Sequence, residues 1–284
     1  MKNKVEKIEI LVHRGAGACS TLRKLNINVN AKDNSKKAFE CAIENGYNLV
    51  ETDVKYFNRS KILVTHDKVK LTKNRKSRTK KEFTKISNQL LLDEPSSKNN
   101  FSGNKPPQHT ENNPLFVNEL NNYKNKLKFN VELKRCLKRH SSIFVDIFLD
   151  TISIDILHSI STFDHNIYFE LIKHKKVVEN KICVFYIVDN QSFGKFCRMF
   201  IKNHKKDGFL QHMNVVFNCN ILDMMKEHIP KLKNIFLYGV ELNQPEFYKK
   251  LFDENKNMKL SGLIIDDLMH FKAKMKKYED FFVF

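Results

Sequence analysis

Eight short apolar runs, separated mostly by segments with helical periodicity, constrain the fold of this 284-residue chain more than any other feature. Strands that alternate with helices predict parallel strands joined by helical crossovers, and eight such units make a closed (β/α)8 TIM barrel. The length agrees, because about 250 residues is typical of this fold and the remainder leaves room for one insertion. The predicted strands span residues 8–13, 48–55, 128–133, 156–161, 182–188, 214–218, 235–240 and 262–266.

The helices between these strands carry recognisable start and stop signals. The first is predicted to begin near Asn34 or Ser35, either of which is a good N-cap, and to end at Gly46. Others are predicted after Leu222 and Pro245. The α/β class therefore rests on both kinds of element.

One segment departs from the alternating pattern. Residues 68–113 are rich in Lys, Ser, Asn and Pro, and are predicted to form an inserted, partly disordered basic loop after the second strand unit. The whole chain, 1–284, is predicted to be a single barrel domain that contains this loop. At the carboxyl end of the barrel, such a loop would lie close enough to act as a lid or substrate selector.

Charged side chains occupy the second and third predicted strands, which otherwise read as buried. Glu51 and Asp53 are two residues apart, as are Glu132 and Lys134. Side chains at i and i+2 of a strand point to the same face, so each pair faces one site. Because unpaired buried charges cost several kcal/mol each, these groups are predicted to meet a cation, an anion and one another.

Glu51, Asp53 and Glu132 offer hard oxygen ligands and are predicted to hold a divalent metal ion. Oxygen ligation favours Mg²⁺ or Ca²⁺, and nothing nearby offers the thiolates or paired imidazoles of a zinc site. Arg14 and Lys134 supply the opposite charge, one as a bidentate fork and one as a point charge. Such a set is typical of a phosphate-binding site.

Two histidines accompany this set. His13 stands at the end of the first predicted strand, and His66 follows a further apolar run that ends at Val64. Each could simply be a strand-end histidine bonded to the backbone, but their charged neighbours at two strand ends favour catalysis. Histidine serves as acid or base near neutral pH, and phosphodiester cleavage needs both roles.

In their order and spacing, these motifs resemble the glycerophosphodiester phosphodiesterase family. The residues that carry the resemblance are His13-Arg14-Gly15, Asp33-Asn34-Ser35 before a helix with Ala38 and Phe39, Glu51-x-Asp53-Val54, His66-Asp67 and Glu132-x-Lys134. A later part of the chain looks most like the eukaryotic glycerophosphocholine phosphodiesterase branch, in Ser161-Thr162-Phe163-Asp164, Tyr238-Gly239, Leu242-Asn243-Gln244-Pro245-Glu246 and Gly262-Leu263-Ile264-Ile265-Asp266. The joint set of motifs is specific, whereas any one piece is weak.

The resemblance implies a (β/α)8 barrel with one divalent cation, Mg²⁺ or Ca²⁺, and assigns roles to matching positions. These are metal ligands at Glu51, Asp53 and Glu132, acid and base histidines at His13 and His66, and phosphate contacts at Arg14 and Lys134. Asp33 and Ser35 stand where the family usually has Glu and Thr, and the chain has no tryptophan. These departures bear on leaving-group recognition and leave the chemistry intact.

The predicted function is therefore metal-dependent hydrolysis of a small glycerophosphodiester, with glycerophosphocholine as the leading substrate, to sn-glycerol 3-phosphate and an alcohol. A lysophospholipase D that acts on lipid diesters is one alternative, and a catalytically silent, phosphate-sensing barrel is another. Phe163, Phe185, Tyr186 and Tyr238 are candidates for a choline-binding wall, although aromatic residues at strand ends are more often ordinary core. Water and the substrate's own 2-hydroxyl both stay open as the nucleophile.

The formal net charge of +18 raises the question of a nucleic-acid or membrane partner. Lysine is spread along the chain, and the one dense run, Lys73 to Lys81, lacks the interleaved aromatic residues that stack on bases. A solvated loop is favoured there, and no nucleic-acid partner is predicted. A peripheral contact with a membrane surface and the oligomeric state stay open.

The six cysteines are scattered without metal or disulfide spacing, which favours a reducing compartment. Residues 1–9 are charged and lack the apolar core of a secretory signal. The most apolar stretch, Ile143 to Ile160, is interrupted by three aspartates, so it is predicted to be a helix followed by a strand. A cytoplasmic location is expected, with no transmembrane segment.

Overall fold

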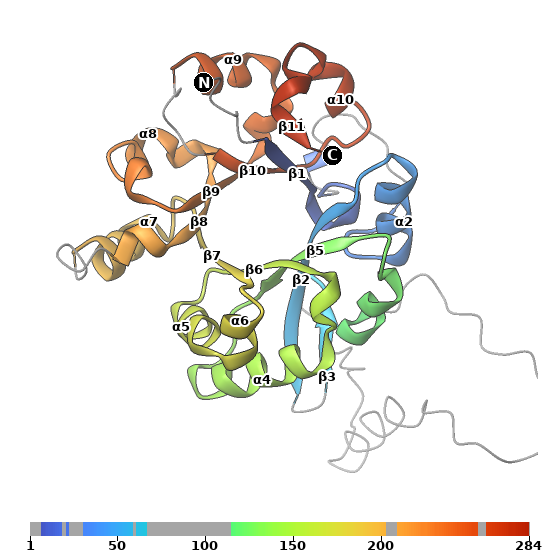
Figure 1. Cartoon of the computed structure of the whole chain (residues 1–284), viewed down its shortest axis with the longest axis vertical. Helices are drawn as coiled ribbons and strands as arrows, with labels where there is room; N and C mark the ends of the chain where they lie inside the picture. The colour runs from blue at the N-terminus through green and yellow to red at the C-terminus, as the bar shows by residue number, and fades with distance from the viewer. Residues whose placement is uncertain are drawn as a thin grey trace, which may run out of the picture. The chain divides into compact units, whose positions relative to one another are not determined.

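Eight parallel strands form a closed ring in the computed structural model, which describes residues 7–18, 21–22, 31–58, 61–66, 115–202, 209–254 and 260–283 (Figure 1). The strands are β1 (Ile8–Val12), β2 (Leu49–Asn58), β5 (Lys128–Leu133), β6 (Leu157–Thr162), β7 (Cys183–Val188), β8 (Asn214–Asn218), β9 (Asn234–Tyr238) and β10 (Leu260–Ile265). Pairing of Val12 with Val50 joins β1 to β2 and closes the ring. The predicted (β/α)8 barrel is confirmed, and each strand lies within a few residues of its predicted run.

Helices lie around the outside of this ring (Figure 1). They are α2 (Lys36–Glu44), α4 (Ser141–Thr151), α5 (His165–Lys173), α6 (Lys175–Glu179), α7 (Phe193–Phe196), α8 (Leu222–Met225), α9 (Pro245–Glu254) and α10 (Phe271–Lys274), with a π-helical turn at Cys197–Lys202 after α7. Short 3-10 turns connect several of them, including η1 (His13–Gly15) and η2 (Val117–Tyr123). The N-cap of α2 is Ser35, whose Oγ accepts a hydrogen bond from the Ala38 N–H at 3.2 Å, as predicted.

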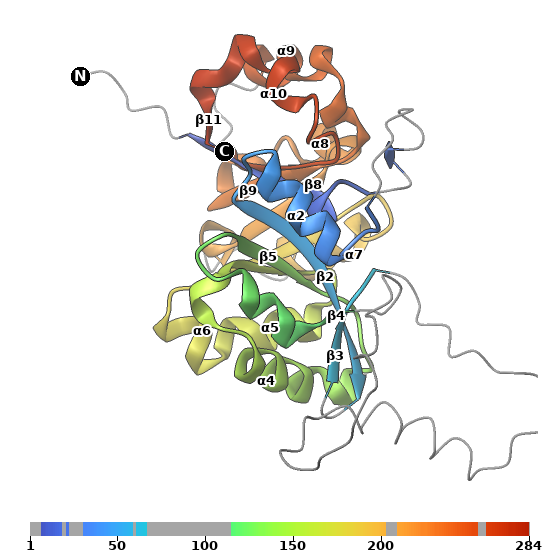
Figure 2. The same cartoon turned by 90° about the vertical axis from the view of Figure 1, so that its right-hand side faces the viewer.

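The unit after β2 differs from the regular pattern. Here β2 turns back into β3 (Lys61–Val64), which pairs antiparallel with β2 and with β4 (Leu115–Phe116). Figure 2 shows β2 running on beyond the ring into this small sheet. The predicted insertion, 68–113, lies outside the described residues and stays a prediction. A short final strand, β11 (Phe282–Val283), pairs with β1.

The barrel interior changes character along its axis. A cluster of apolar side chains fills part of it, namely Leu11, Leu49, Phe185, Ile187, Val216, Phe236 and Ile264. A larger apolar cluster includes Val50, Val54 and residues of the surrounding helices, such as Phe39 of α2 and Phe144 of α4. Leu49, in the interior cluster, is followed at two-residue spacing by Glu51 and Asp53, so this row passes from apolar to charged towards the carboxyl end of the strand. That end is where active sites of such barrels lie.

The apolar stretch 143–160 forms most of α4, a short connection and the start of β6, which confirms the predicted helix and strand. Across the described part of the chain, no helix combines the length and apolar character that a membrane crossing needs. Free thiols are found at Cys41, Cys136, Cys183, Cys197 and Cys219.

Candidate active site

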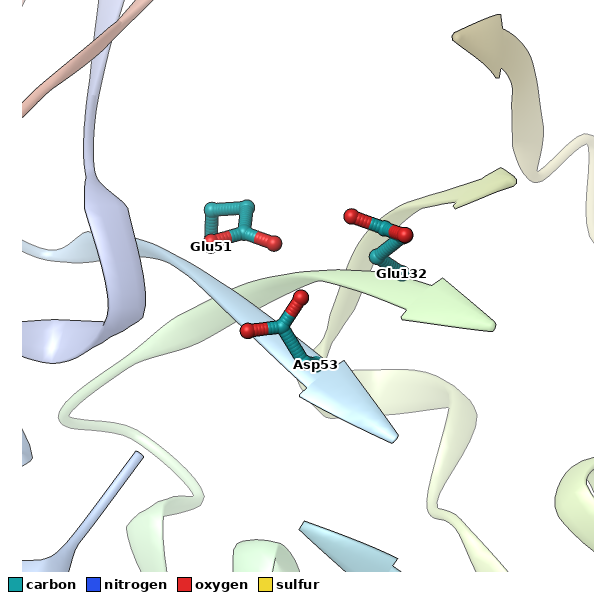
Figure 3. Close-up of side chains that lie close together, drawn as sticks. All are labelled: Glu51, Asp53 and Glu132. Atoms are coloured by element: carbon teal, nitrogen blue, oxygen red, sulfur yellow. The ribbon is translucent and has the colours of Figure 1, made fainter. Parts of the chain in front are cut away.

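Three buried carboxylates meet at the carboxyl end of two neighbouring strands. Glu51 and Asp53 come from β2, and Glu132 comes from β5, where it is the register partner of Asp53. One ligand oxygen from each lies within 4.8 Å of the other two. Figure 3 shows the three carboxylates turned towards a common point. Glu51 and Asp53 thus lie on the same face of β2, as predicted from their spacing, and the pairing of β2 with β5 places Glu132 beside them.

This carboxylate cluster fits a hard divalent cation. Its ligand atoms are all oxygens, and Glu51, Asp53 and Glu132 are each less than 7% exposed. Burial, together with repulsion from Asp53 and Glu132, raises the pKa of Glu51. The negative charges in this cluster repel one another, and a cation bound between the three carboxylates would relieve that repulsion.

Lys134 and Arg14 partly neutralise the cluster. The Lys134 Nζ lies 2.7 Å from Asp53 Oδ1 and 2.6 Å from Glu132 Oε1, and the Arg14 Nε lies 3.2 Å from Asp53 Oδ2. Burial opposes the charged form of Asp53, but Lys134 and Arg14 outweigh it and hold the pKa of this carboxyl well below its usual range. Asp33 Oδ2 accepts a hydrogen bond from the Arg14 Nη1 at 2.9 Å and so fixes the guanidinium from the outside. Both predicted phosphate ligands are therefore at the site.

His13 is held between two carboxylates. Its Nδ1 lies 2.7 Å from Asp266 Oδ1, and its Nε2 lies 3.7 Å from Glu51 Oε2. Burial disfavours the charged imidazole, but Asp266 and Glu51 outweigh this effect and raise the pKa of His13 to about 8. Asp266 follows β10 directly, is 4% exposed, and was not among the predicted site residues. In the sequence, Asp266 stands at the end of the last barrel strand and closes the motif Gly262-Leu263-Ile264-Ile265-Asp266, but the resemblance assigned it no role.

The loop that carries His13 is wound tightly. Arg14 has φ +52°, and its backbone N–H donates to Glu51 Oε2 at 3.2 Å. Gly17 has φ +87°, and a β-carbon at that position would lie 2.0 Å from the Asp266 carbonyl oxygen. The Ala18 N–H then donates to Asp266 Oδ1 at 2.8 Å. Glycine at position 17 is required because the chain passes directly over the end of β10.

A cavity of about 150 Å³ unites these groups. One side is charged and the other is largely apolar; the lining residues are His13, Arg14, Glu51, His66, Glu132, Lys134, Ser161, Phe163, Ile187, Val216, Tyr238 and Ile264. His66 arrives from β3, outside the ring, and its carbonyl oxygen accepts a hydrogen bond from the Lys55 ammonium. The small antiparallel sheet therefore brings the second predicted histidine to the cavity that His13 lines.

Residues 13–182 match the family described as the glycerophosphoryl diester phosphodiesterase family, a match over more than half of the chain. The chain belongs to this family. Members of this family are phosphoric diester hydrolases, so the chain is an enzyme of this class.

Solved structures show the same fold at low sequence identity. An Oleispira antarctica phosphodiesterase in complex with the product sn-glycerol-3-phosphate is 12% identical, with a TM-score of 0.59 and coverage of 95% of this chain and 97% of that one. This chain is also similar to two glycerophosphodiester phosphodiesterases. The one from Parabacteroides distasonis is 15% identical, with a TM-score of 0.56 and coverage of 97% of this chain and 98% of that one. The one from Thermotoga maritima is 19% identical, with a TM-score of 0.54 and coverage of 94% of this chain and 97% of that one. No curated protein matches the sequence.

Of the four aromatic residues weighed as a choline-binding wall in this family member, two line the cavity. Phe163 and Tyr238 do so, at the ends of β6 and β9. Phe185 packs inside the barrel against Phe236, with ring centroids 4.4 Å apart, and Tyr186 is buried in the larger apolar cluster. Of these four side chains, Phe163 and Tyr238 are therefore the two that are placed to touch a ligand in the cavity.

Proposed function

We propose that this phosphodiesterase hydrolyses glycerophosphodiesters in a metal-dependent reaction, with glycerophosphocholine as the leading substrate and sn-glycerol 3-phosphate and an alcohol as products. The observation that carries the proposal is the shared cavity: two histidines, an arginine, a lysine and two of the three clustered carboxylates line it. The phosphodiesterase complex from Oleispira antarctica holds the same product. The choice of choline rests on the resemblance of residues 161–266 to the eukaryotic branch and on the aromatic faces of Phe163 and Tyr238.

Each group has a role in the proposed reaction. Glu51, Asp53 and Glu132 hold Mg²⁺ or Ca²⁺, which when bound supplies positive charge to the phosphoryl oxygens. Arg14 and Lys134 contact the phosphate and neutralise charge that grows on it in the transition state. One of the two histidines, His13 and His66, takes a proton from the nucleophile, and the other gives a proton to the leaving oxygen.

A lysophospholipase D activity is the second candidate, and the apolar side of the cavity favours it. Ile187, Val216 and Ile264 lie there beside the two aromatic residues, and none of these five side chains carries a formal charge at neutral pH. Such a wall suits an alkyl chain as well as a choline methyl group. Lysophosphatidylcholine, a lipid diester, is therefore one of the substrates that test the proposal.

The test measures release of glycerol 3-phosphate or choline from glycerophosphocholine, glycerophosphoethanolamine and lysophosphatidylcholine, each with Mg²⁺, Ca²⁺ or EDTA. Wild type is compared with Glu51→Gln and His13→Ala, and Glu9→Gln serves as a matched control. Glu9 is also on a barrel strand but pairs with His158 at 3.0 Å, away from the cavity. We expect EDTA and both site variants to reduce turnover roughly 100-fold or more, because each removes a group that acts on the transition state.

Glu9→Gln should keep wild-type turnover. Folded wild type that releases nothing from any of the three substrates with either metal would refute the proposed activity. Faster cleavage of lysophosphatidylcholine than of glycerophosphocholine would instead favour the lipid diesterase.

A further inference from the structure

Asn34 adopts a backbone conformation that few residues with a side chain adopt. Its φ is +57°, and it lies opposite Arg14, whose φ is +52°. The Asn34 N–H donates to the Arg14 carbonyl oxygen at 3.0 Å, which ties the loop after β1 to the turn before α2. Asparagine tolerates this left-handed region better than most residues do. A conformation of this kind persists where the surrounding contacts hold it in place.

The Asn34 side chain reaches β2, where its amide forms hydrogen bonds with residues 52 and 53. Its Nδ2 donates to Asp53 Oδ2 at 2.9 Å. Its Oδ1 accepts from the Thr52 hydroxyl at 2.8 Å and from the Asp53 N–H at 3.2 Å. The Thr52 hydroxyl and the Asp53 N–H need an acceptor, which is the amide oxygen, and the Asp53 carboxylate needs a donor, which is the amide nitrogen. The amide can meet both needs in one orientation, so its orientation is fixed. Asn34 is 4% exposed, so water does not compete freely for these bonds.

The two oxygens of Asp53 are consequently unequal. Oδ2 is occupied by the Asn34 amide and lies 3.2 Å from the Arg14 Nε. Oδ1 faces the Lys134 ammonium at 2.7 Å, and that same ammonium lies 2.6 Å from Glu132 Oε1. The oxygen on the side of the carboxylate cluster is therefore Oδ1.

We propose that Asn34 is a positioning residue that presents Oδ1 of Asp53, and only that oxygen, to the cation held by Glu51, Asp53 and Glu132. Asp53 would then offer Oδ1 alone to the cation, because Oδ2 accepts the hydrogen bond from the Asn34 amide. The inference rests on the metal site of the proposed function and adds to it Asn34, for which the sequence predicted only a possible role as a helix N-cap. Hydrogen-bonded partners of this kind orient ligating carboxylates and strengthen metal binding.

The residue type fits this role closely. Glycine would accept the left-handed backbone but would leave Asp53 Oδ2 without the amide donor. Aspartate has the same shape but would place an acceptor oxygen against Asp53 Oδ2. These two replacements therefore separate the backbone contribution of position 34 from the contribution of its amide.

The experiment is calorimetric titration of the full chain with Ca²⁺ alone, repeated with Mg²⁺, for wild type, Asn34→Gly, Asn34→Asp and Thr52→Val. The matched control is Asn125→Gly, because Asn125 is an exposed asparagine with φ +70° in the turn before β5. We expect Asn34→Gly to weaken cation binding about 10- to 100-fold, the range for loss of a partner that orients a ligand. Asn34→Asp should weaken binding at least as much, and Thr52→Val should weaken it by a few-fold, since it removes only one of the bonds that orient the amide.

Thermal melts in EDTA report the structural cost of each variant separately from its cation affinity. Cation affinity in a folded Asn34→Gly variant within about 3-fold of wild type would overturn the inference while leaving the proposed function intact. Wild type that binds neither cation would overturn the metal site itself, and with it both proposals. Loss of affinity in Asn125→Gly equal to that in Asn34→Gly would show that the effect is not specific to position 34, and would also overturn the role of the amide.

Discussion

The contact between His13 and Asp266 determines how the imidazole is presented to the cavity. A carboxylate 2.7 Å from Nδ1 keeps a proton on that nitrogen and leaves Nε2 to face Glu51 and the cavity. The same Asp266 oxygen accepts the Ala18 N–H, so the ring and its loop are held by one buried atom. His13 therefore depends on the far end of the chain for both its tautomer and its orientation.

We expect Asp266→Asn to lower kcat on glycerophosphocholine roughly 100-fold or more, with little change in Ca²⁺ affinity, because the amide cannot hold the same tautomer. Steady-state kinetics and Ca²⁺ titration measure the two quantities. Asp267→Asn is the matched control, since Asp267 is 1% exposed and pairs with His270 and Lys274. Equal losses of kcat in the two variants would show that only general stability had changed.

At the scale of elements, the loop of residues 13–17 and the end of β10 form one closely packed corner. Gly17 allows the loop to pass the Asp266 carbonyl, and the Gly17 N–H donates to the His13 carbonyl oxygen at 2.7 Å. The position of this loop sets the positions of His13 and Arg14 together. Any residue with a β-carbon at position 17 must displace the loop from β10.

Gly17→Ala is predicted to lower the free energy of unfolding by more than the roughly 1 to 2 kcal/mol typical of a left-handed alanine, and to reduce kcat as well. Denaturant melts and steady-state assays measure the two effects. Gly46→Ala gives the comparison, because Gly46 also has a positive φ of +72° but meets only the end of the Lys272 side chain, at 3.2 Å. Activity of Gly17→Ala equal to that of Gly46→Ala would mean that the loop tolerates the displacement.

The same elements show what the sequence could predict. The barrel strands were evident because each is a local apolar run, and Glu51, Asp53 and Glu132 were found because side chains alternate along a strand. The antiparallel pairing of β3 with β4 was not predicted, since the two strands are short and lie on either side of residues 65–114. Asp266 was missed as a partner of His13 because the contact depends on β10 pairing with β1, near the two ends of the chain.

At the scale of the whole molecule, the charge state of the site links folding stability to pH and to metal. The pKa values of His13 and Glu51 are both raised, that of His13 from 6.5 to about 8. A raised pKa means that the folded state binds the proton more tightly than the unfolded state does. The resulting stabilisation is complete below the ordinary pKa of each group and is lost as the pH rises through the raised value.

The melting temperature in EDTA should therefore fall as the pH rises from about 6.5 to about 8, the window set by His13. Ca²⁺ should oppose the fall, because a cation takes over the role of the protons, and Ca²⁺ at about 100 times its Kd adds about 2.7 kcal/mol. Scanning calorimetry across this range, with and without Ca²⁺, checks both statements. Glu51→Gln should show a weaker pH slope and a weaker response to Ca²⁺, whereas a melting temperature that rises with pH in EDTA would contradict the linkage.

The apolar cluster in the barrel interior has a consequence for the order of events. Three side chains of this cluster are each less than 9% exposed: Leu11, Leu49 and Phe236. They fill the barrel interior on the far side of the carboxylates, so the cavity is closed at that end. Whatever enters from the carboxyl end of the strands leaves by the same route. Under the proposed function, Arg14 and Lys134 bind the phosphate of glycerol 3-phosphate, so this product dissociates second, after the free alcohol has left the cavity. Glycerol 3-phosphate should then compete with fresh substrate, so that hydrolysis slows as its own product accumulates.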